Sequence, residues 1–435
     1  MIQVTLLMLL TSLAVGLPVA AVLALTGYVL SENYAFIPMT AASGELAWSH
    51  SNDFVLIAAP MFIMMGELMH RSGVSERLFS ALTPWFTRVP GQLIHTNIAA
   101  SAVFAATSGS SLATAATIGT VAIPNMDKGG YSRPLFLGSI AAGGTLGILI
   151  PPSVNMIIYA VLSETSVADL YAAGFLPGIL LAVLFSAVVV VAVLWNPKLA
   201  PATDFQGSLW PARIAGLKHL VPPLCLFFLV VGSIYLGIAT PTEAAALGLV
   251  ATVGLVGLNG ALTVPVLLSA FEGTVRTTCM IMLIVIAAFF LNFVMVSIGL
   301  VEAITGALLS LGWPPLAMLA AIVVFYLVLG CFMETISMMI ATTPIIVPVI
   351  VKLGYSPVWW GIVFVILIEA ALITPPVGLN LYVVQAVRKT GSIADLFKGS
   401  APFLVAMLLT IILLVSFPQL ALWLPTILNP KSGPV

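Results

Sequence analysis

The chain is a series of long apolar runs separated by short polar stretches. Three of these runs, at 172–195, 220–237 and 407–424, contain no charged residue. Each run is long enough for an α-helix to cross the hydrocarbon core of a bilayer, which is ~30 Å thick. The pattern therefore predicts an all-α protein that crosses a membrane several times.

Composition supports this interpretation. Of 435 residues, 61% are hydrophobic and only 7% are charged, against about 25% charged in an ordinary soluble domain. A net charge of −1 argues against a nucleic-acid partner. The three cysteines lie in apolar runs and are interpreted as small hydrophobic residues, and the four histidines form no ligand cluster along the chain.

Landmarks of the first half of the chain recur in the second. A shift of 224 positions brings Pro151-Pro152 onto Pro375-Pro376. When the shift is increased by two residues, the segment Ser-Val-Ala-Asp-Leu at 166–170 aligns with Ser-Ile-Ala-Asp-Leu at 392–396. Prolines and an Ala-Asp-Leu word that recur in order indicate two copies of one unit.

Basic residues suggest that the copies have opposite orientations. The central part of the second copy has only Lys352, whereas the first has five basic residues: Arg71, Arg77, Arg88, Lys128 and Arg133. If the first group is cytoplasmic, only Lys352 and Lys431 of the fourteen lie outside, as the positive-inside rule requires. Both termini are then periplasmic, although a single kinked N-terminal span would reverse the N-terminus. Inverted repeats are typical of secondary transporters.

The repeat predicts the organisation of the chain. The first inverted repeat covers 1–195, a cytoplasmic linker 196–218, the second inverted repeat 219–425 and a periplasmic tail 426–435. Each repeat is expected to contain scaffold helices, an interfacial helix, a re-entrant hairpin, a Pro-broken helix and a final span, which covers 400–425 in the second. The hairpins are expected at about 93–126 and 314–352, and the broken helices at about 134–163 and 357–387.

The first hairpin has a Ser/Gly-rich tip between two apolar arms. Ser110 and Ser111 suit the N-cap of the returning arm. A helix end at membrane depth needs a protein or water partner, and its N-terminus attracts an anion. The alternative is a packing contact between small residues.

The equivalent tip of the second copy carries an acid, Glu334. An acid at this depth is a functional candidate, and a helix-capping carboxylate is a second role compatible with the first. Glu243 follows Pro241 and is interpreted as a first-turn cap. For Glu67 and Glu369 the sequence leaves open an interface salt bridge or an ion or proton relay.

A Pro-Pro pair interrupts one apolar span in each copy. Prolines block helical hydrogen bonds and free carbonyl groups, and nearby serine, threonine and asparagine side chains add oxygens. Such cages of weakly charged oxygens suit Na⁺, the only metal expected, although an ordinary proline kink is the alternative. We predict these sodium ligands: Ser108, Gly109, Ser110, Ser153, Asn155, Glu334, Thr335, Thr374, Pro375, Gly378 and Asn380.

We expect an anionic substrate between the two tips. Its predicted contacts are Ser110, Ser111, Thr114, Pro152, Thr335 and Pro376. Repeat equivalence would group Ser108–Ser111 with Ser153 in one ion site, and Glu334–Thr335 with residues 374–380 in the other.

Five segments together resemble the large membrane (M) subunit of TRAP transporters, the tripartite ATP-independent periplasmic family. They are 58–63 (AAPMFI), 108–119 (SGSSLATAATIG), 150–153 (IPPS), 239–245 (ATPTEAA) and 374–380 (TPPVGLN). The likeness covers essentially the whole chain.

This resemblance implies a Na⁺-driven importer of an organic acid in the bacterial inner membrane, with no organic cofactor. Its hairpins and broken helices would slide against a scaffold in an elevator movement. Its partners would be a separate small four-helix membrane subunit, a soluble periplasmic binding protein and membrane lipid. The resemblance does not specify the acid.

Three other functions compete with this one. A stand-alone Na⁺/divalent-anion symporter has a similar repeat plan. An intramembrane enzyme is disfavoured because the sequence has neither HExxH nor GxSxG. A channel is disfavoured because paired broken helices in inverted repeats favour alternating access.

Overall fold

The structure is a computed structural model that describes residues 1–37, 39–201, 208–331 and 333–428, apart from the side chains of residues 10 and 14. Over these ranges the regular elements are α-helices and two short 3-10 helices, and no strand occurs. Six helices (α10, α11, α12, α13, α16 and α19) are long and apolar enough to cross a membrane. A seventh span results if α8 and α9, which meet at a 45° bend, are counted together. The all-α membrane fold expected from the sequence is confirmed.

The described part of the N-terminal region (residues 1–195) contains ten α-helices and one 3-10 helix (Met39–Ala42). The α-helices are α1 (Ile2–Ala14), α2 (Val19–Tyr34), α3 (Ser43–Ser51), α4 (Ala58–Arg71), α5 (Val74–Phe86), α6 (Leu93–Ser108), α7 (Ser111–Gly129), α8 (Arg133–Leu149), α9 (Val154–Ser163) and α10 (Val167–Trp195).

The C-terminal region (residues 208–428) continues the chain. Its helices are α11 (Trp210–Tyr235), α12 (Pro241–Leu258), α13 (Val264–Ser297), α14 (Leu300–Leu309), α15 (Pro315–Leu329), α16 (Thr335–Lys352), α17 (Pro357–Leu372), α18 (Leu379–Arg388), α19 (Ala394–Ser416) and α20 (Gln419–Leu428).

Local chemistry explains where the hairpin and the broken helix of the N-terminal region bend. Gly109 ends α6 with φ of +60°, a conformation that glycine adopts without strain. Ser110 then caps α7. Pro151 and Pro152 separate α8 from α9, and Ser153 caps the new helix by accepting from the Met156 amide at 3.3 Å. Each bend therefore combines a helix-ending residue with a capping serine.

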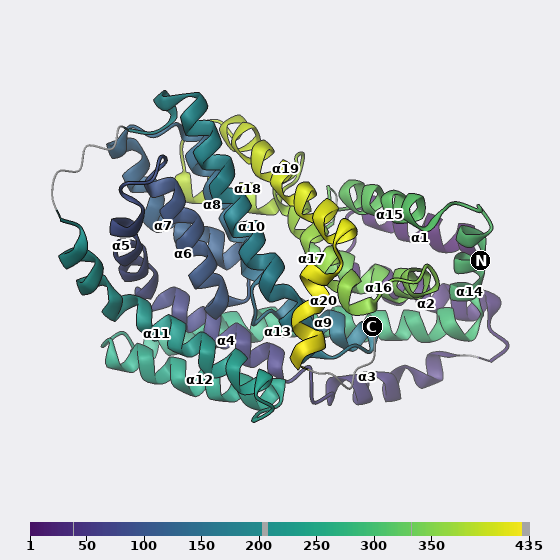
Figure 1. The fold of residues 1–435 in the computed structure, drawn as a ribbon. Coiled ribbons are helices and arrows are strands. Elements are labelled where there is room, and N and C mark those ends of the chain that lie inside the picture. The colour runs from purple at the N-terminus through teal and green to yellow at the C-terminus, as the bar shows by residue number, and fades with distance from the viewer. Residues whose placement is uncertain (38, 202–207, 332, 429–435) are drawn as a thin grey trace.

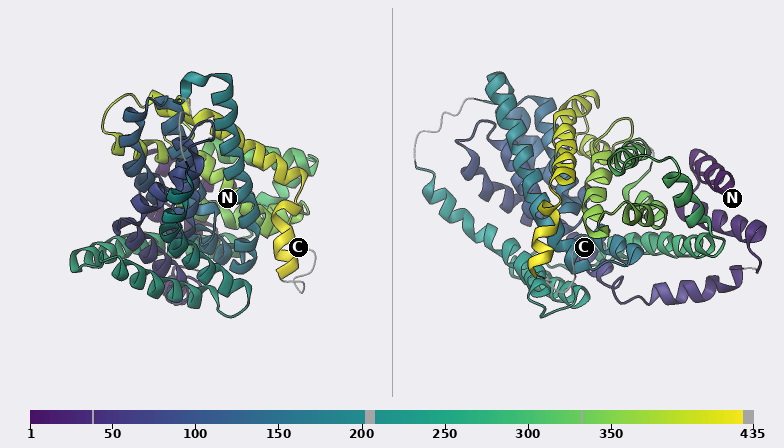
Figure 2. Two further views of the ribbon diagram at one scale, coloured as in Figure 1. Left: turned by 60° about the vertical axis from the view of Figure 1, so that its left-hand side comes forward. Right: turned by 45° about the vertical axis from the view of Figure 1, so that its right-hand side comes forward.

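Helix boundaries recur with the spacing found in the sequence. α7 begins at Ser111 and α16 at Thr335, while α8 begins at Arg133 and α17 at Pro357; both pairs differ by 224 positions. In Figure 1, α5 to α8 lie on the left and α14 to α16 on the right, with α10 and α17 between them. Figure 2 shows the same helices from two other sides. That the two copies cross the membrane in opposite directions stays a prediction.

The two regions exchange contacts through their hairpins. The returning arm α7 packs against α18, and the returning arm α16 packs against α9. α8 also packs along α19, where Gly138 and Gly399 approach so closely that a Cβ on either would overlap the backbone of the opposite helix. Small residues are what permit such a close crossing of helices.

Several boundaries differ from the expected ones. Helix α3 was not anticipated. The single span expected at 400–425 is two helices, α19 and α20, separated at Phe417-Pro418 because proline cannot continue the helix. The linker expected at 196–218 is shorter, because α11 already begins at Trp210; residues 202–207 of that linker lie outside the described ranges. Of the tail expected at 426–435, residues 426–428 complete α20 and the rest lies outside the described residues.

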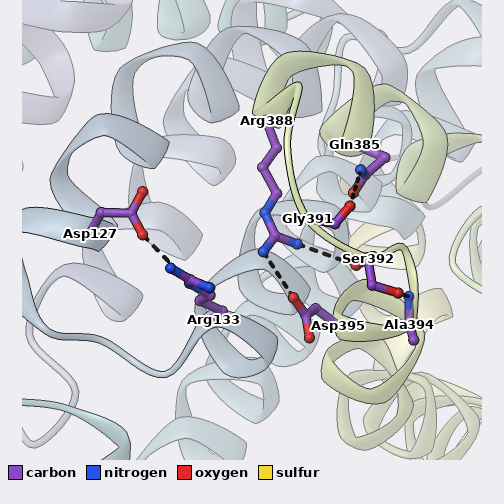
Figure 3. Close-up of polar contacts among 8 residues, drawn as sticks. All are labelled: Asp127, Arg133, Gln385, Arg388, Gly391, Ser392, Ala394 and Asp395. Atoms are coloured by element: carbon purple, nitrogen blue, oxygen red, sulfur yellow. Dashed lines mark hydrogen bonds and ion pairs between the residues drawn. The ribbon is translucent and has the colours of Figure 1, made fainter.

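The loop between α18 and α19 is held by Arg388, the last residue of α18. Its guanidinium lies 2.8 Å from the Asp395 carboxylate and 3.3 Å from the Ser392 carbonyl oxygen (Figure 3). Gln385 donates to the Gly391 carbonyl at 2.9 Å. Gly391 has φ of +90°, and a Cβ there would overlap the guanidinium. These contacts fix the end of α18 relative to α19.

Candidate transport site

A cavity of about 120 Å³ lies where the two hairpin tips meet. Its wall contains seven of the residues expected at the ion and substrate sites: Ser108, Gly109, Ser110, Ser111, Asn155, Glu334 and Thr335. The first residues of α7 and of α16, Ser111 and Thr335, are both among them. Two helix N-termini, each the positive end of a helix dipole, therefore adjoin one cavity.

The α6–α7 tip is packed tightly on its neighbours. A Cβ on Gly109 would lie 2.9 Å from the Pro152 carbonyl oxygen, so the tip rests directly on the proline break between α8 and α9. A Cβ on Gly66 of α4 would lie 2.6 Å from the Ser108 carbonyl oxygen. The tip thus touches both a broken helix and α4, and neither contact leaves room for a larger residue.

Hydroxyl groups connect the residues of this tip. Ser110 Oγ accepts a long hydrogen bond of 3.4 Å from the Ala113 amide. Thr114 donates to the Ser110 carbonyl at 2.8 Å, and its hydroxyl lies 2.9 Å from that of Ser108. The expectation that Ser110 caps the returning arm is confirmed. Thr114 lies behind the wall, as a support for Ser108 and Ser110.

Glu334 caps α16 at the other tip. Its two carboxylate oxygens accept from the amides of Ile336 and Ser337, each at 3.0 Å, and from the hydroxyls of Thr335 and Ser337 at 3.0 and 3.1 Å. The capping role considered from the sequence is therefore present. The carboxylate also contributes the only acidic group of the tip to the cavity wall.

The proline break of the N-terminal region is buried beside the cavity. Ser153 is fully buried, and its carbonyl oxygen accepts from the Tyr171 hydroxyl at 3.2 Å. Asn155 is 2% exposed and lines the cavity, and its side-chain nitrogen has no hydrogen-bond partner in the described residues. The side chain of Asn155 therefore has a hydrogen-bond donor that no described residue uses.

The break of the C-terminal region lies outside the cavity wall. Thr374 donates to the Ala370 carbonyl at 2.7 Å, and the Pro375 carbonyl accepts from the Cys331 thiol at 3.5 Å. Pro376 is exposed and its carbonyl accepts from Tyr382 at 3.3 Å. Gly378 adopts φ of +44° where α18 begins. The Cys331 contact brings this break close to the tip of its own hairpin.

Asn380 departs from the expected grouping with Glu334. Its amide nitrogen donates to the Ala141 carbonyl of α8 at 3.2 Å, and a Cβ on Gly144 would lie 3.1 Å from the same nitrogen. Asn380 is fully buried, and its side-chain oxygen has no hydrogen-bond partner in the described residues. The contacts therefore associate Asn380 with the N-terminal region, because α18 crosses over to pack on α7 and α8.

Three residues near the cavity could not be assigned from the sequence. Glu67 of α4 lines the wall and forms an ion pair with Arg71, 3.0 Å away; their spacing of four residues was the available signal. Thr277 of α13 lines the wall but lies in an apolar run without a motif. Glu369 of α17 contacts Ser111 across 258 positions, which no local pattern indicates.

Comparison with known proteins agrees with this architecture. Residues 6–420 match the model of the DctM component of tripartite ATP-independent periplasmic transporters. The chain is 32% identical to the C4-dicarboxylate TRAP transporter large permease protein DctM of Vibrio cholerae over 95% of each chain. It is also 32% identical to the sialic acid TRAP transporter large permease protein SiaM of that organism, over 86% of this chain and 87% of the relative.

Among solved structures, the YdaH transporter of Alcanivorax borkumensis shares the fold. The match has a TM-score of 0.62 and 15% identity and covers 97% of this chain and 98% of the other. The family match includes both hairpins and both broken helices, and the two permease relatives cover 95% and 86% of this chain. The chain therefore belongs to the TRAP transporter family as its large permease, a multi-pass protein of the inner membrane.

Proposed function

We propose that this large permease is the substrate-translocating subunit of a Na⁺-driven importer of an organic acid. The acid is delivered by a periplasmic binding protein, and a separate small membrane subunit completes the complex. The observation that carries the proposal is the cavity shared by the two hairpin tips, since it combines two helix N-termini with a set of hydroxyl and amide groups.

The cavity suits an anion. Helix N-termini bind carboxylates through their amides and their dipole. Both α7 and α16 begin in the wall, and because the Glu334 carboxylate already caps α16, the N-terminus of α7 is the one proposed for the substrate. A buried water needs only roughly 10–15 Å³, so about 120 Å³ accommodates a small organic acid. The two relatives, a C4-dicarboxylate and a sialic acid permease, both handle carboxylates, which makes a carboxylate the substrate class proposed here.

Sodium coupling is supported by oxygens without strong charge. Ser108 and Ser110 lie at one tip, and the buried Asn380 side chain leaves an unsatisfied oxygen beside α7 and α8. An unpaired buried acceptor costs roughly 1–3 kcal/mol, and a bound cation would remove that penalty. We propose Na⁺ as the ion that binds at these oxygens.

An elevator movement is supported by how the tips are held. The α6–α7 tip lies against Gly66 of α4 and rests on the α8–α9 break through Gly109. Together with the packing of α7 on α18 and of α8 on α19, this suggests one body of hairpins and broken helices that slides past α4 and α13.

Transport into proteoliposomes tests the proposal. The permease is reconstituted with its small subunit, and candidate binding proteins loaded with a C4-dicarboxylate or with sialic acid are added outside. We expect uptake only with an inward Na⁺ gradient and a binding protein. Equal uptake when K⁺ replaces Na⁺, without a proton gradient, would overturn Na⁺ coupling. Uptake without any binding protein would instead indicate a stand-alone symporter.

A further inference from the structure

Two helices outside the hairpins complete the wall of the transport cavity. Ile63 and Glu67 come from α4, and Thr277 and Ile281 come from α13. The rest of the wall comes from the hairpins and the broken helices. In the proposed elevator movement α4 and α13 stay in place. An anion carried by the sliding body therefore meets these four residues only while the body lies in the position that the structure has.

Basic residues beside this fixed part of the wall place it toward the cytoplasm. Arg71 ends α4, one turn after Glu67. Arg276 directly precedes Thr277 on α13. Both arginines belong to the set expected inside by the positive-inside rule. On that predicted orientation, this position of the body is the one from which an importer releases its substrate.

The carboxylate of Glu67, and not its partner, reaches the cavity. Glu67 lies in the wall, whereas Arg71, 3.0 Å away, is not a wall residue. A Cβ on Gly273 of α13 would lie 2.9 Å from the Glu67 carboxyl carbon. The carboxylate therefore packs against α13 one turn from Thr277, which is itself part of the wall. The charge that the fixed helices present to an anion in the cavity is thus negative.

The sliding body and the fixed wall act on an anion in opposite ways. The N-terminus of α7 attracts the anion and moves with it. Glu334 is acidic, but it belongs to the sliding body and has the same effect in every position. Repulsion by Glu67 ends when the body leaves α4, because Coulomb energy falls with distance. Glu67 therefore weakens binding in one position of the body and not in the other, which is the differential affinity that shifts such an equilibrium.

We propose that Glu67 promotes release of the organic acid, because its carboxylate lowers the affinity of the cavity in the position that faces the cytoplasm. The inference rests on the proposed function, in which the substrate is an anion and α4 is fixed. Arg71 holds the carboxylate in place through their ion pair. Release of product limits turnover in many enzymes, and release of the acid is the step on which Glu67 acts.

Charged thiol reagents measure the potential of the cavity without any substrate. Ala113 lines the cavity and is half-buried, and Ala113→Cys is made in a protein whose three native cysteines are replaced by serine. In nanodiscs this protein is labelled with a sulfonate and with a trimethylammonium methanethiosulfonate. Adding Glu67→Gln should raise the ratio of anionic to cationic labelling rates by roughly two- to five-fold, the range of exposed charge pairs. An unchanged ratio would overturn the proposal.

Glu272→Gln is the matched control for this experiment. Glu272 forms the same kind of ion pair with Arg276, four residues away and at 3.0 Å, and neither residue lies in the cavity wall. Its loss removes one helix-surface ion pair, as Glu67→Gln does, and should leave the labelling ratio unchanged. An equal change of the ratio in both variants would mean that Glu67 has no special place at the cavity, and would refute the proposal.

Uptake kinetics test the role in release. Proteoliposomes under an inward Na⁺ gradient receive binding proteins loaded with a C4-dicarboxylate or with sialic acid. Glu67→Gln should lower kcat and KM together by roughly two- to five-fold, because an acid held more tightly leaves more slowly. Glu67→Asp keeps the charge and should restore the wild-type kcat, and Glu272→Gln should follow wild type. Unchanged kcat and KM in Glu67→Gln, or a raised KM, would overturn the proposal.

The same assay separates this proposal from the proposed function. Uptake that tolerates K⁺ in place of Na⁺, with the effects of Glu67→Gln intact, would refute Na⁺ coupling and support the role of Glu67. Wild type that transports neither acid would refute the proposed substrate class and this proposal with it.

Discussion

Replacing Ser110 by alanine removes one hydroxyl with two proposed roles. Ser110 Oγ caps α7 through a 3.4 Å bond from the Ala113 amide, and loss of an N-cap costs roughly 0.5–2 kcal/mol of stability. In our proposal the same oxygen binds Na⁺. Loss of a hydrogen bond to a charged group costs roughly 1.5–3 kcal/mol, which corresponds to about ten-fold or more in Na⁺ affinity.

Ser166→Ala provides a matched control. Ser166 Oγ caps α10 through a 3.2 Å bond from the Asp169 amide, and Ser166 is not part of the cavity wall. Both variants should lose similar thermal stability, while only Ser110→Ala should raise the Na⁺ concentration for half-maximal uptake. The assay is the Na⁺ dependence of uptake into proteoliposomes, beside thermal unfolding of each purified variant. If the two variants share one Na⁺ dependence, Ser110 is only a cap and the tip holds no ion through this side chain.

Three further predictions concern packing and topology. Gly138→Ala should lower the melting temperature, because overpacking costs roughly 1–3 kcal/mol. Gly254→Ala is the control and should leave the melting temperature unchanged, because a Cβ there meets no atom within 4 Å. Equal melting temperatures for the two variants would contradict the close α8–α19 crossing. Gly391→Ala should also destabilise the protein, since φ is +90° and a Cβ meets a guanidinium; unchanged melting would show that the loop can rearrange. Cysteines at the exposed positions Glu76 and Ser310 should react with impermeant thiol reagents from the cytoplasm and the periplasm, respectively, and labelling of both from one side would refute the inverted orientation.

The elements that the sequence predicted are those encoded by local chemistry. The break at Pro151-Pro152 and the cap at Ser110 follow from missing backbone donors and from a capping hydroxyl, which act within one turn of helix. Helix α3 and the separation of α20 from α19 were missed. Apolar composition alone does not say where a run is divided, and one proline in such a run can either kink a helix or end it.

Seven of the residues predicted for the two sites line one cavity, and their roles stay predictions. Ser108 and Glu334 are polar residues within apolar runs, and this pattern is visible in the sequence itself. Asn380 was grouped by repeat equivalence with Glu334, but α18 crosses to the other region and brings it to Ala141. Which helix crosses to which partner depends on packing across the whole molecule.

The exchanged packing of the hairpins has a consequence for synthesis. Ser111 meets Glu369 across 258 positions, and Asn380 meets Ala141 across 239. Contacts between residues so far apart in the sequence form late, because the intervening chain must first be made and inserted. At a typical ~5–20 residues per second, the α6–α7 tip waits on the order of ten seconds or more for its last partner. During that interval the polar groups of the α6–α7 tip lack the partners that the complete chain provides.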